Sequence, residues 1–177
     1  GYDEAVEEAQ QKGFAEADST LDVNGQDAAH KLALLARIIT RSHVPLEQIF
    51  TEGIEQVTAE DISFASGLGY RIKLLSIASR NEDGSWELRV HPALVQQDEV
   101  LARVQREVNA VQVKGDAVGS MLVYGNGAGS LPTASSVVAD IVRAAKGDKP
   151  IMNSANGQAP RIVSIGEVAV RNYIRVM

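Results

Sequence analysis

The segment Tyr70-Arg-Ile-Lys-Leu-Leu-Ser-Ile-Ala-Ser-Arg80, followed by Asn81-Glu-Asp-Gly-Ser85 and Trp86-Glu-Leu-Arg-Val90, decides the predicted fold. Apolar side chains alternate along the first and last of these pieces, as they do in strands with one buried face. The middle piece contains Asn, Asp and Gly, which favour a tight turn. The segment therefore predicts a β-hairpin, and Pro92 is predicted to end its second strand.

Helices are predicted on the N-terminal side of this hairpin. Residues 2–12 place an apolar stripe opposite several glutamates, and residues 46–50 form a short turn or helix after Pro45. A helix from Thr58 to about residue 68 begins with a capping-box pattern, because Asp61 follows the threonine by three positions. The strongest helical pattern covers residues 26–40, where the predicted buried stripe consists of Ala28, Leu32, Leu35 and Ile39, widened by Leu34 and Ile38.

Further strands and a last helix are predicted after the hairpin. Residues 99–106 read as a short helix, residues 109–114 and 118–124 as two strands, and residues 132–146 as a helix after a glycine-rich loop. This order predicts an α+β fold with a mixed, mostly antiparallel sheet and helices packed on one face. The uncovered face of such a sheet leads us to expect a homodimer.

Composition narrows the class of protein. The chain has 177 residues, 45% of them apolar, which is enough for one medium-sized domain with a core. The net charge of -6 and the lack of a basic run argue against a nucleic acid or an anionic membrane as the partner. The absence of cysteine excludes disulfides, thiol nucleophiles and thiolate metal sites, and fits a cytoplasmic protein. The charge-free run 117–139 is interrupted by glycines and Pro132, so no membrane helix is predicted.

The candidate site is the acidic stretch 15–31. Because neighbouring carboxylates repel one another, packing alone gives no reason to gather them here. Asp27 and Lys31 lie one helical turn apart, which on most helices is only a solvated ion pair. Apolar side chains on the next turns predict partial desolvation of Lys31, which would let its amine exchange protons near neutral pH. The acids of the stretch are Glu16, Asp18, Asp22 and Asp27.

Other motifs carry weaker signals. The segment Asp22-Val-Asn-Gly25 resembles the start of a calcium loop, but the remaining ligands do not follow. Gly125-x-Gly127-x-Gly129 precedes a predicted helix, where a phosphate could bind, but the motif alone is weak and a tight turn that needs glycine explains it better. The Rossmann pattern fails because position 130 is serine. The three histidines have no metal-ligand spacing, and no metal site is predicted.

The chain contains two long motifs, Gly13-Phe-Ala-Glu-Ala-Asp-Ser-Thr-Leu-Asp-Val-Asn-Gly-Gln-Asp-Ala-Ala-His-Lys31 and Gly125-Asn-Gly-Ala-Gly-Ser-Leu-Pro-Thr-Ala-Ser-Ser-Val-Val-Ala-Asp140. In sequence and in order they resemble the motifs of homoserine dehydrogenases. His91-Pro-Ala-Leu-Val95 matches a further family segment. The resemblance implies interconversion of L-homoserine and L-aspartate 4-semialdehyde with NADP or NAD, in the aspartate pathway to threonine, methionine and isoleucine.

The resemblance also implies roles for individual residues. Lys31 matches the lysine that donates a proton, and Asp27 matches its partner in the active site. Glu16 matches the acid that binds the substrate amino group, and Asp22 the acid near the substrate hydroxyl; Asp18 is expected to be structural. Gly129, with Gly127 and Thr133 beside it, matches the part of the family that contacts the dinucleotide. One position departs from the family pattern, because Ser19 stands where proline is usual.

The resemblance divides the chain into three parts. Residues 1–146 correspond to the catalytic, substrate-binding and dimerisation domain, residues 147–166 to a linker, and residues 167–177 to the first strand of a truncated ACT-like domain. The family's dinucleotide-binding domain has no counterpart in the 177 residues. We therefore expect a piece of a longer enzyme, inactive when isolated. The alternative is a module that binds an amino acid or dimerises without catalysing a reaction.

Overall fold

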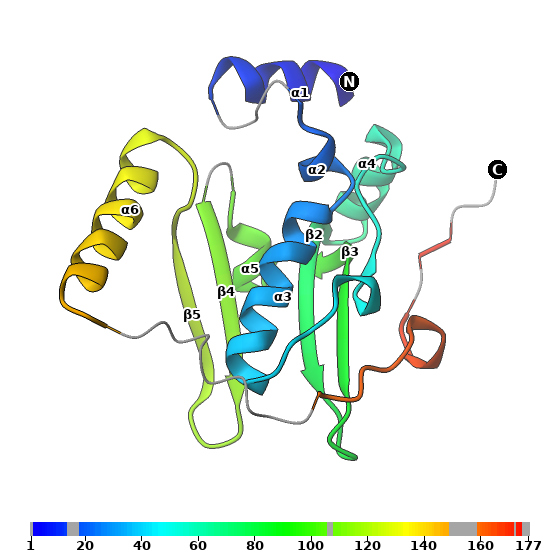
Figure 1. Cartoon of the computed structure of the whole chain (residues 1–177). Coiled ribbons are helices and arrows are strands. Elements are labelled where there is room, and N and C mark those ends of the chain that lie inside the picture. Colours follow the sequence, from blue (N-terminus) through cyan, green and yellow to red (C-terminus); the bar gives the residue numbers. More distant parts are fainter. Residues whose placement is uncertain (1, 14–17, 106–107, 149–158, 172, 175–177) are drawn as a thin grey trace. The chain divides into compact units, whose positions relative to one another are not determined.

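The computed structural model describes residues 2–13, 18–105, 108–148, 159–171 and 173–174 (Figure 1). These residues form an α+β fold, as predicted, with a mixed sheet and a separate antiparallel pair of strands. The chain divides into two compact units. The first consists of Gly1–Thr20, Glu55–Lys73 and Pro92–Pro150, and the second of Leu21–Ile54, Leu74–His91 and Ile151–Met177.

The second unit contains the helix that carries the candidate site. Helix α2 (Thr20–Val23) leads into α3 (Gln26–Thr40), and the 3-10 helix η1 (Leu46–Gln48) leads into the short strand β1 (Phe50–Thr51). The predicted hairpin is confirmed as β2 (Tyr70–Arg80) and β3 (Trp86–Gln96), and the strand order is β1-β3-β2. Strand β1 runs parallel to β3, with Phe50 opposite Arg89 and Thr51 opposite Val90.

The core of this unit lies between α3 and the sheet. Helix α3 contributes mainly small side chains, and β3 contributes Leu88 and Val90. Burying this apolar surface is the main favourable term that holds the helix on the strands. The buried cluster consists of Ala29, Leu32, Ala36, Val44, Ile49, Leu88 and Val90.

The predicted buried stripe of α3 is therefore only partly correct. Leu32 is buried and Ala28 packs against the core, but Leu35 and Ile39 are exposed, as are Leu34 and Ile38. The helix is apolar over most of its circumference, so its sequence alone cannot identify the buried side. The alanine side faces the sheet because small side chains let a helix and a strand approach closely.

The first unit contains most of the remaining elements. They are α1 (Tyr2–Gln11), α4 (Ala59–Gly67), α5 (Val100–Arg103), β4 (Val108–Gly115), β5 (Gly119–Asn126) and α6 (Ser130–Ala145). The predicted capping box of α4 is confirmed, because the Thr58 hydroxyl accepts from the Asp61 N–H at 3.2 Å and the Asp61 carboxylate accepts from the Thr58 N–H at 2.9 Å. Strands β4 and β5 pair antiparallel along their whole length.

Strand β3 continues through Pro92, so the prediction that this proline ends the strand is wrong. The N–H groups of alternate residues point to the same edge of a strand, and the Val90 carbonyl already faces the β1 side, where it accepts from the Glu52 N–H at 2.8 Å. Position 92 faces the same side, and β1 ends at Thr51. The missing N–H of proline therefore removes no ladder hydrogen bond.

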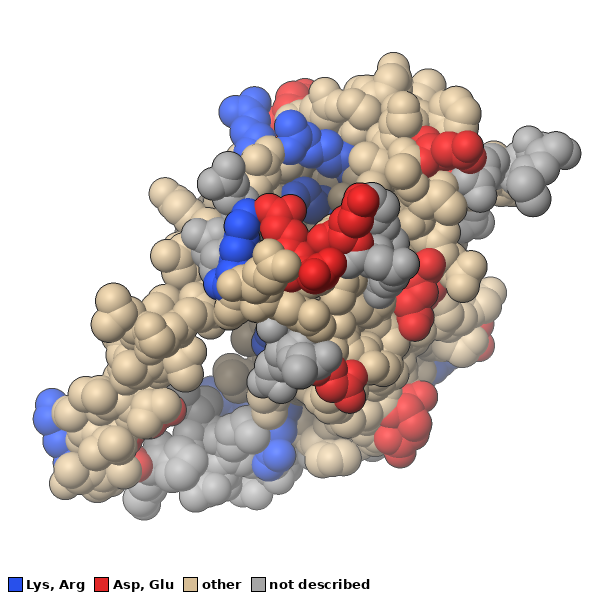
Figure 2. Space-filling model, turned by 90° about the horizontal axis from the view of Figure 1, so that it is seen from above, with Lys and Arg blue, Asp and Glu red and all other residues tan. Residues whose placement is uncertain are grey.

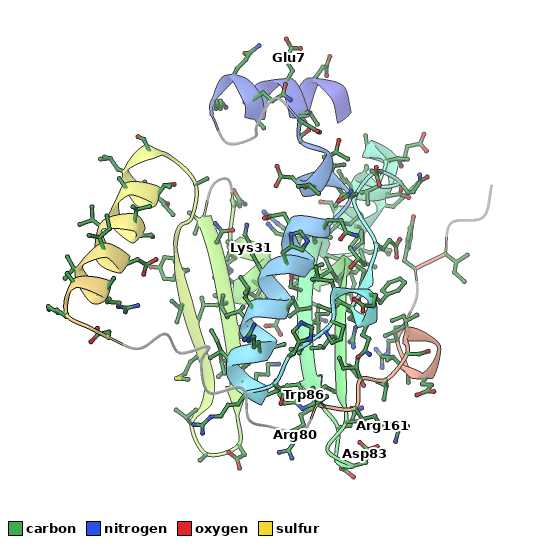
Figure 3. All side chains as sticks on the ribbon, viewed as in Figure 1. Glu7, Lys31, Arg80, Asp83, Trp86 and Arg161 are labelled. Atoms are coloured by element: carbon green, nitrogen blue, oxygen red, sulfur yellow. The ribbon has the colours of Figure 1, made fainter. Side chains whose placement is uncertain are left out.

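The segment after residue 158 also differs from its prediction. Ile162 forms a parallel bridge with Trp86, and Val163 N–H donates to the Trp86 carbonyl at 2.9 Å. Arg161 forms an ion pair of 3.6 Å with Asp83 at the hairpin turn (Figure 3). The 3-10 helix η3 (Ile165–Glu167) follows. A strand is predicted over residues 167–177, but the described residues after η3, which are 168–171 and 173–174, do not form a strand.

Two surface properties bear on the expected partners. No helix in the described part of the chain combines the length and the apolar character needed to cross a membrane. The face drawn in Figure 2 carries both acidic and basic side chains.

The position of α3 on the sheet can be tested with two leucines of that helix. Leu32 is 3% exposed and Leu34 is 50% exposed. We expect Leu32→Ala to lower the free energy of unfolding by about 2–5 kcal/mol, because it leaves a cavity beside β3. Leu34→Ala should lower it by less than about 0.5 kcal/mol. Urea denaturation of the two variants measures both effects, and equal losses would contradict this packing.

Candidate active site on helix α3

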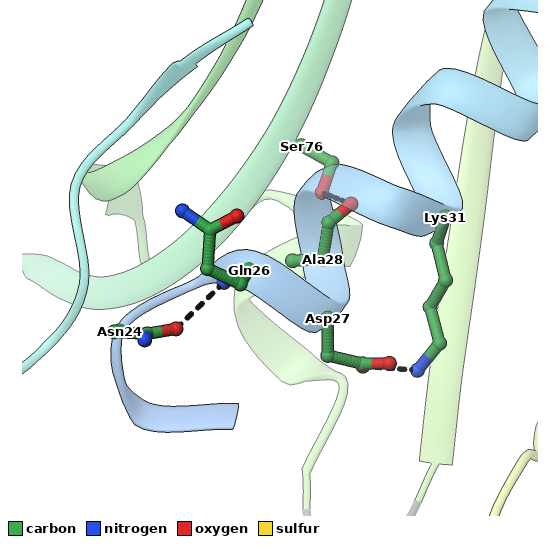
Figure 4. Close-up of polar contacts among 6 residues, drawn as sticks. All are labelled: Asn24, Gln26, Asp27, Ala28, Lys31 and Ser76. Atoms are coloured by element: carbon green, nitrogen blue, oxygen red, sulfur yellow. Dashed lines mark hydrogen bonds and ion pairs between the residues drawn. The ribbon is translucent and has the colours of Figure 1, made fainter. Parts of the chain in front are cut away.

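The corner between α2 and α3 fixes the start of the site-bearing helix. Asn24 accepts a hydrogen bond from the Gln26 N–H at its side-chain oxygen, at 3.0 Å (Figure 4). Gly25 follows with a φ of 82°, a left-handed conformation that favours glycine. The Ala29 N–H then donates to the Gly25 carbonyl at 3.0 Å and closes the first turn. Asn24 was not among the residues predicted to shape the site, although Asn-Gly is a strong turn signal.

Asp27 and Lys31 lie together on α3, as their spacing predicts. Lys31 Nζ is 2.5 Å from Asp27 Oδ2, and the pair is drawn in Figure 4. Asp27 belongs to the first turn, where the helix dipole favours a carboxylate. The paired groups therefore present a cation held by an anion at the N-terminal end of a helix.

The predicted desolvation of Lys31 is not found in this chain. Its side chain is 67% exposed and that of Asp27 is 40% exposed. The expectation was based on the apolar neighbours Leu34 and Leu35, but these side chains are themselves exposed and do not exclude water. An ion pair in this setting contributes little to stability, typically below about 1 kcal/mol. A contribution to stability therefore does not explain why the Asp27–Lys31 pair is present.

Helix α3 is attached to the sheet on the side away from this pair. Ala29 and Leu32 are buried against β3, and the Ser76 hydroxyl of β2 donates to the Ala28 carbonyl at 3.4 Å (Figure 4). Lys31, labelled in Figure 3, is on the opposite, exposed side. The pair is thus carried on a fixed helix and is accessible to a small molecule.

The other acids of the stretch have separate positions. Glu16 lies outside the described residues. Asp22 is exposed on α2, four residues before Gln26 begins α3. The Asp18 carboxylate accepts from the Thr20 N–H at 3.1 Å and so has a local structural role at the start of α2. Among the described residues, no group of three or more His, Asp or Glu side chains could hold a metal ion.

The glycine-rich loop lies in the other unit, between β5 and α6. Gly129 precedes α6 with a φ of 108°, and no side chain caps the helix there. The Thr133 N–H donates to the Gly129 carbonyl at 3.2 Å. A side chain at Gly127 would collide with the Asn109 side chain, whereas a Cβ atom at Gly129 would meet only Pro132 at 3.7 Å. The neighbour of Gly127 is thus a side chain that can rotate away, while the surroundings of Gly129 are open.

Comparison with known proteins gives a consistent result. The family model described as homoserine dehydrogenase matches residues 1–142. A homoserine dehydrogenase of Pseudomonas aeruginosa is 53% identical over 141 residues, which cover 80% of this chain and 32% of the relative. That of Neisseria gonorrhoeae is 40% identical over 184 residues, covering 99% of this chain and 42% of the relative.

Solved structures agree with these matches. A crystal structure of a homoserine dehydrogenase from Thiobacillus denitrificans has a TM-score of 0.85 and 46% identity, and the match covers 94% of this chain and 41% of that one. A homoserine dehydrogenase of S. aureus gives a TM-score of 0.75 at 42% identity, covering 84% of this chain and 38% of that one. The chain spans 32–42% of the length of the curated relatives it matches.

The role of Asp18 can be tested by its titration. Hydrogen bonds from the Thr20 hydroxyl and then from the Thr20 N–H hold the pKa of Asp18 below its ordinary value of 3.8. The resulting stabilisation is present above the ordinary pKa and is lost as the pH falls through the lowered pKa of the folded state. Thr20→Val should raise the pKa of Asp18 in an NMR carboxylate titration, and Ser19→Ala should not. An unchanged pKa in Thr20→Val would contradict the hydroxyl contact.

Proposed function

The chain belongs to the homoserine dehydrogenase family, and on this premise we propose that it forms the substrate-binding and catalytic part of an NADP- or NAD-dependent homoserine dehydrogenase. The reaction interconverts L-homoserine and L-aspartate 4-semialdehyde. The observation that carries the proposal is the exposed pair in which Lys31 Nζ lies 2.5 Å from Asp27 Oδ2.

Lys31 is the proton-transfer group in this proposal. Reduction of the aldehyde places negative charge on its oxygen, and a neighbouring ammonium group can stabilise that charge and then donate a proton. In the opposite direction the same nitrogen receives the proton of the homoserine hydroxyl. Asp27 holds Nζ in place by the ion pair and keeps it oriented on α3. The exposure of the pair leaves room for the substrate beside it.

The remaining acids fit the other end of the substrate. A carboxylate is the natural partner of an α-ammonium group, and we assign this role to Glu16, with Asp22 near the substrate hydroxyl. Asp22 is on α2, directly before the corner that begins α3. These assignments are based on the motif of residues 13–31.

The glycine-rich loop is the proposed contact with the cofactor. Gly129 fits this role, because its open surroundings and the uncapped start of α6 leave backbone N–H groups for a phosphate. Thr133 belongs to the same first turn. Gly127 fits less directly, since Asn109 already occupies the space beside it. The nicotinamide cofactor supplies the hydride donor or acceptor of the reaction.

We further propose that residues 1–146 act as the catalytic domain, followed by a linker at 147–166 and the start of an ACT-like domain at 167–177. A site without its dinucleotide-binding domain should not turn over, so the chain alone is expected to be inactive. The enzyme would serve the aspartate pathway to threonine, methionine and isoleucine in the cytoplasm.

The strands β4 and β5 support the proposed homodimer. Their cross-strand pairs Val111–Val123 and Val113–Met121 place four apolar side chains on one face, and all four are exposed. Exposed apolar patches of this kind often mark interfaces. A second copy that covers this face would remove them from water.

Lys31→Met tests the catalytic assignment. In the full-length gene product that contains these residues, we expect homoserine oxidation to fall roughly 100- to 10,000-fold, because a proton-transfer group is lost. Lys12→Met is a matched control, since Lys12 also forms an exposed i,i+4 ion pair, with Glu8. The measurement is reduction of NADP or NAD followed by absorbance. Near wild-type turnover in Lys31→Met would refute the assignment, and homoserine binding without turnover in the unmodified protein would favour a binding module.

Val123→Glu tests the proposed dimer. A charge on the apolar face should shift the protein from dimer to monomer in sedimentation velocity, because it would be buried at the interface. Ser120→Glu adds the same charge to the opposite face of β5 and should leave the dimer intact. A monomeric unmodified protein at high concentration would contradict the proposal.

A further inference from the structure

The loop at residues 52–54, which follows the last residue of β1, is packed against the corner that begins the site-bearing helix. The Ile54 N–H donates to the Val23 carbonyl at 2.9 Å, so the loop is hydrogen-bonded to the last residue of α2. The Glu52 N–H donates to the Val90 carbonyl at 2.8 Å, which attaches the same loop to β3. Val23 and Val90 are both buried. The loop therefore connects the corner to the most buried strand of the unit.

Gly53 is the point of closest approach between the two segments. A Cβ atom at this position would lie 2.6 Å from the Cα atom of Asn24 and 2.8 Å from its carbonyl carbon, and closer still to the Val23 carbonyl oxygen. Real Cβ contacts are essentially never below 3.0 Å. All three atoms belong to the backbone, so no side-chain rotation could relieve the collision. Only glycine permits this contact.

The corner is enclosed from its other end as well. Gly25 has its left-handed φ of 82°, and a Cβ atom there would lie 3.2 Å from the Thr51 methyl group and 3.4 Å from the Glu52 carbonyl oxygen. Residues 51–53 thus lie against the backbone from Val23 to Gly25, with backbone atoms alone at Gly53 and with the Thr51 methyl group beside Gly25. The path of the chain between α2 and α3 is set by this contact.

We propose that Gly53 is a positioning residue for the proposed dehydrogenase site and acts through the corner 23–25. This inference rests on the proposed function. Asp22 is directly before the corner, and Asp27 is two residues after it. Lys31, one turn further, neighbours Leu32, which is fixed in the core. Asp27 and Lys31 stay together on α3, so a displacement of the corner moves Asp22 relative to this pair.

A substitution at Gly53 is expected to change turnover and the KM for homoserine without changing the KM for the dinucleotide. Gly53→Ala must push the corner and the loop apart by several tenths of an ångström. Errors of about 1 Å in the placement of reacting groups cost on the order of 100-fold in rate. We expect kcat to fall roughly 10- to 100-fold and the KM for homoserine to rise, while the KM for the dinucleotide stays within about twofold.

Gly67→Ala provides the matched control. Gly67 ends α4 and has no left-handed φ, and a Cβ atom at this position would meet no other atom within 4 Å. The same glycine-to-alanine change should therefore leave kcat and both KM values unchanged. Steady-state kinetics of the full-length gene product with both variants give the comparison. Equal kinetics in Gly53→Ala and Gly67→Ala, with an active wild type, would overturn the inference while leaving the proposed function intact.

A second pair of variants applies if Gly53→Ala does not fold. Asn24→Ala removes the hydrogen bond to the Gln26 N–H, and Asn24→Ser keeps an oxygen that can accept it. We expect Asn24→Ala to show the same loss of kcat with an unchanged dinucleotide KM, and Asn24→Ser to restore most of it. Wild-type kinetics in Asn24→Ala would overturn the positioning role of the corner.

Amide chemical shifts of the 177-residue chain give a readout that does not depend on activity. Gly53→Ala should shift the amides of residues 22–27, whereas Gly67→Ala should not. An inactive wild-type full-length gene product would refute the proposed function and with it the catalytic role of Gly53. The chemical shifts would then still test whether Gly53 fixes the backbone of the corner 23–25. Unchanged shifts at residues 22–27 in Gly53→Ala would show that it does not.

Discussion

The close packing of α3 on β3 is the contact on which the rest of the candidate site depends. Ala29 and Ala36 have almost no exposed surface, and they meet Leu88 and Val90 of the strand. Side chains this small let the two backbones pack close together, and this close packing fixes the orientation of α3 about its own axis. That setting directs Asp27 and Lys31 away from the core. It also leaves the larger apolar side chains of α3 exposed, so the helix has one side that packs within the chain and another available to a partner surface.

Much of the fold follows from local sequence rules. The hairpin was predictable because alternation and turn chemistry agree at residues 70–90, and α4 because its capping box satisfies backbone groups at one helix end. The rest depends on contacts distant in sequence. Strand β1 has two residues and no periodicity of its own, and it exists because β3 offers a parallel edge. The prediction for Pro92 is wrong because the place of a proline in β3 depends on where β1 ends. The prediction for the buried side of α3 is partly wrong because leucine and isoleucine lie around most of the circumference of that helix.

The candidate site was predictable to the extent that it is local. Asp27 and Lys31 come together because four residues make one helical turn, which needs no tertiary information. The expected desolvation of Lys31 failed because it required knowledge of which neighbours are buried. Gly127 resembles its neighbours in the glycine-rich loop, yet only the structure shows that the Asn109 side chain of β4 lies beside it. Gly53 gave no signal at all in the sequence, since its importance comes from the meeting of two segments that are distant along the chain.

The bridge between Trp86 and Ile162 has a mechanical consequence. Residues 161–163 join β3 at the edge that β1 occupies further along, and the ion pair of Arg161 with Asp83 attaches them to the hairpin turn. A pull or rotation transmitted through the chain beyond Val163 would reach the sheet first at Trp86. From there, β3 leads to Val90, which holds the loop beside the α2–α3 corner through Glu52. Strand β3 thus contacts both residues 161–163 and the segment that lies beside the α2–α3 corner.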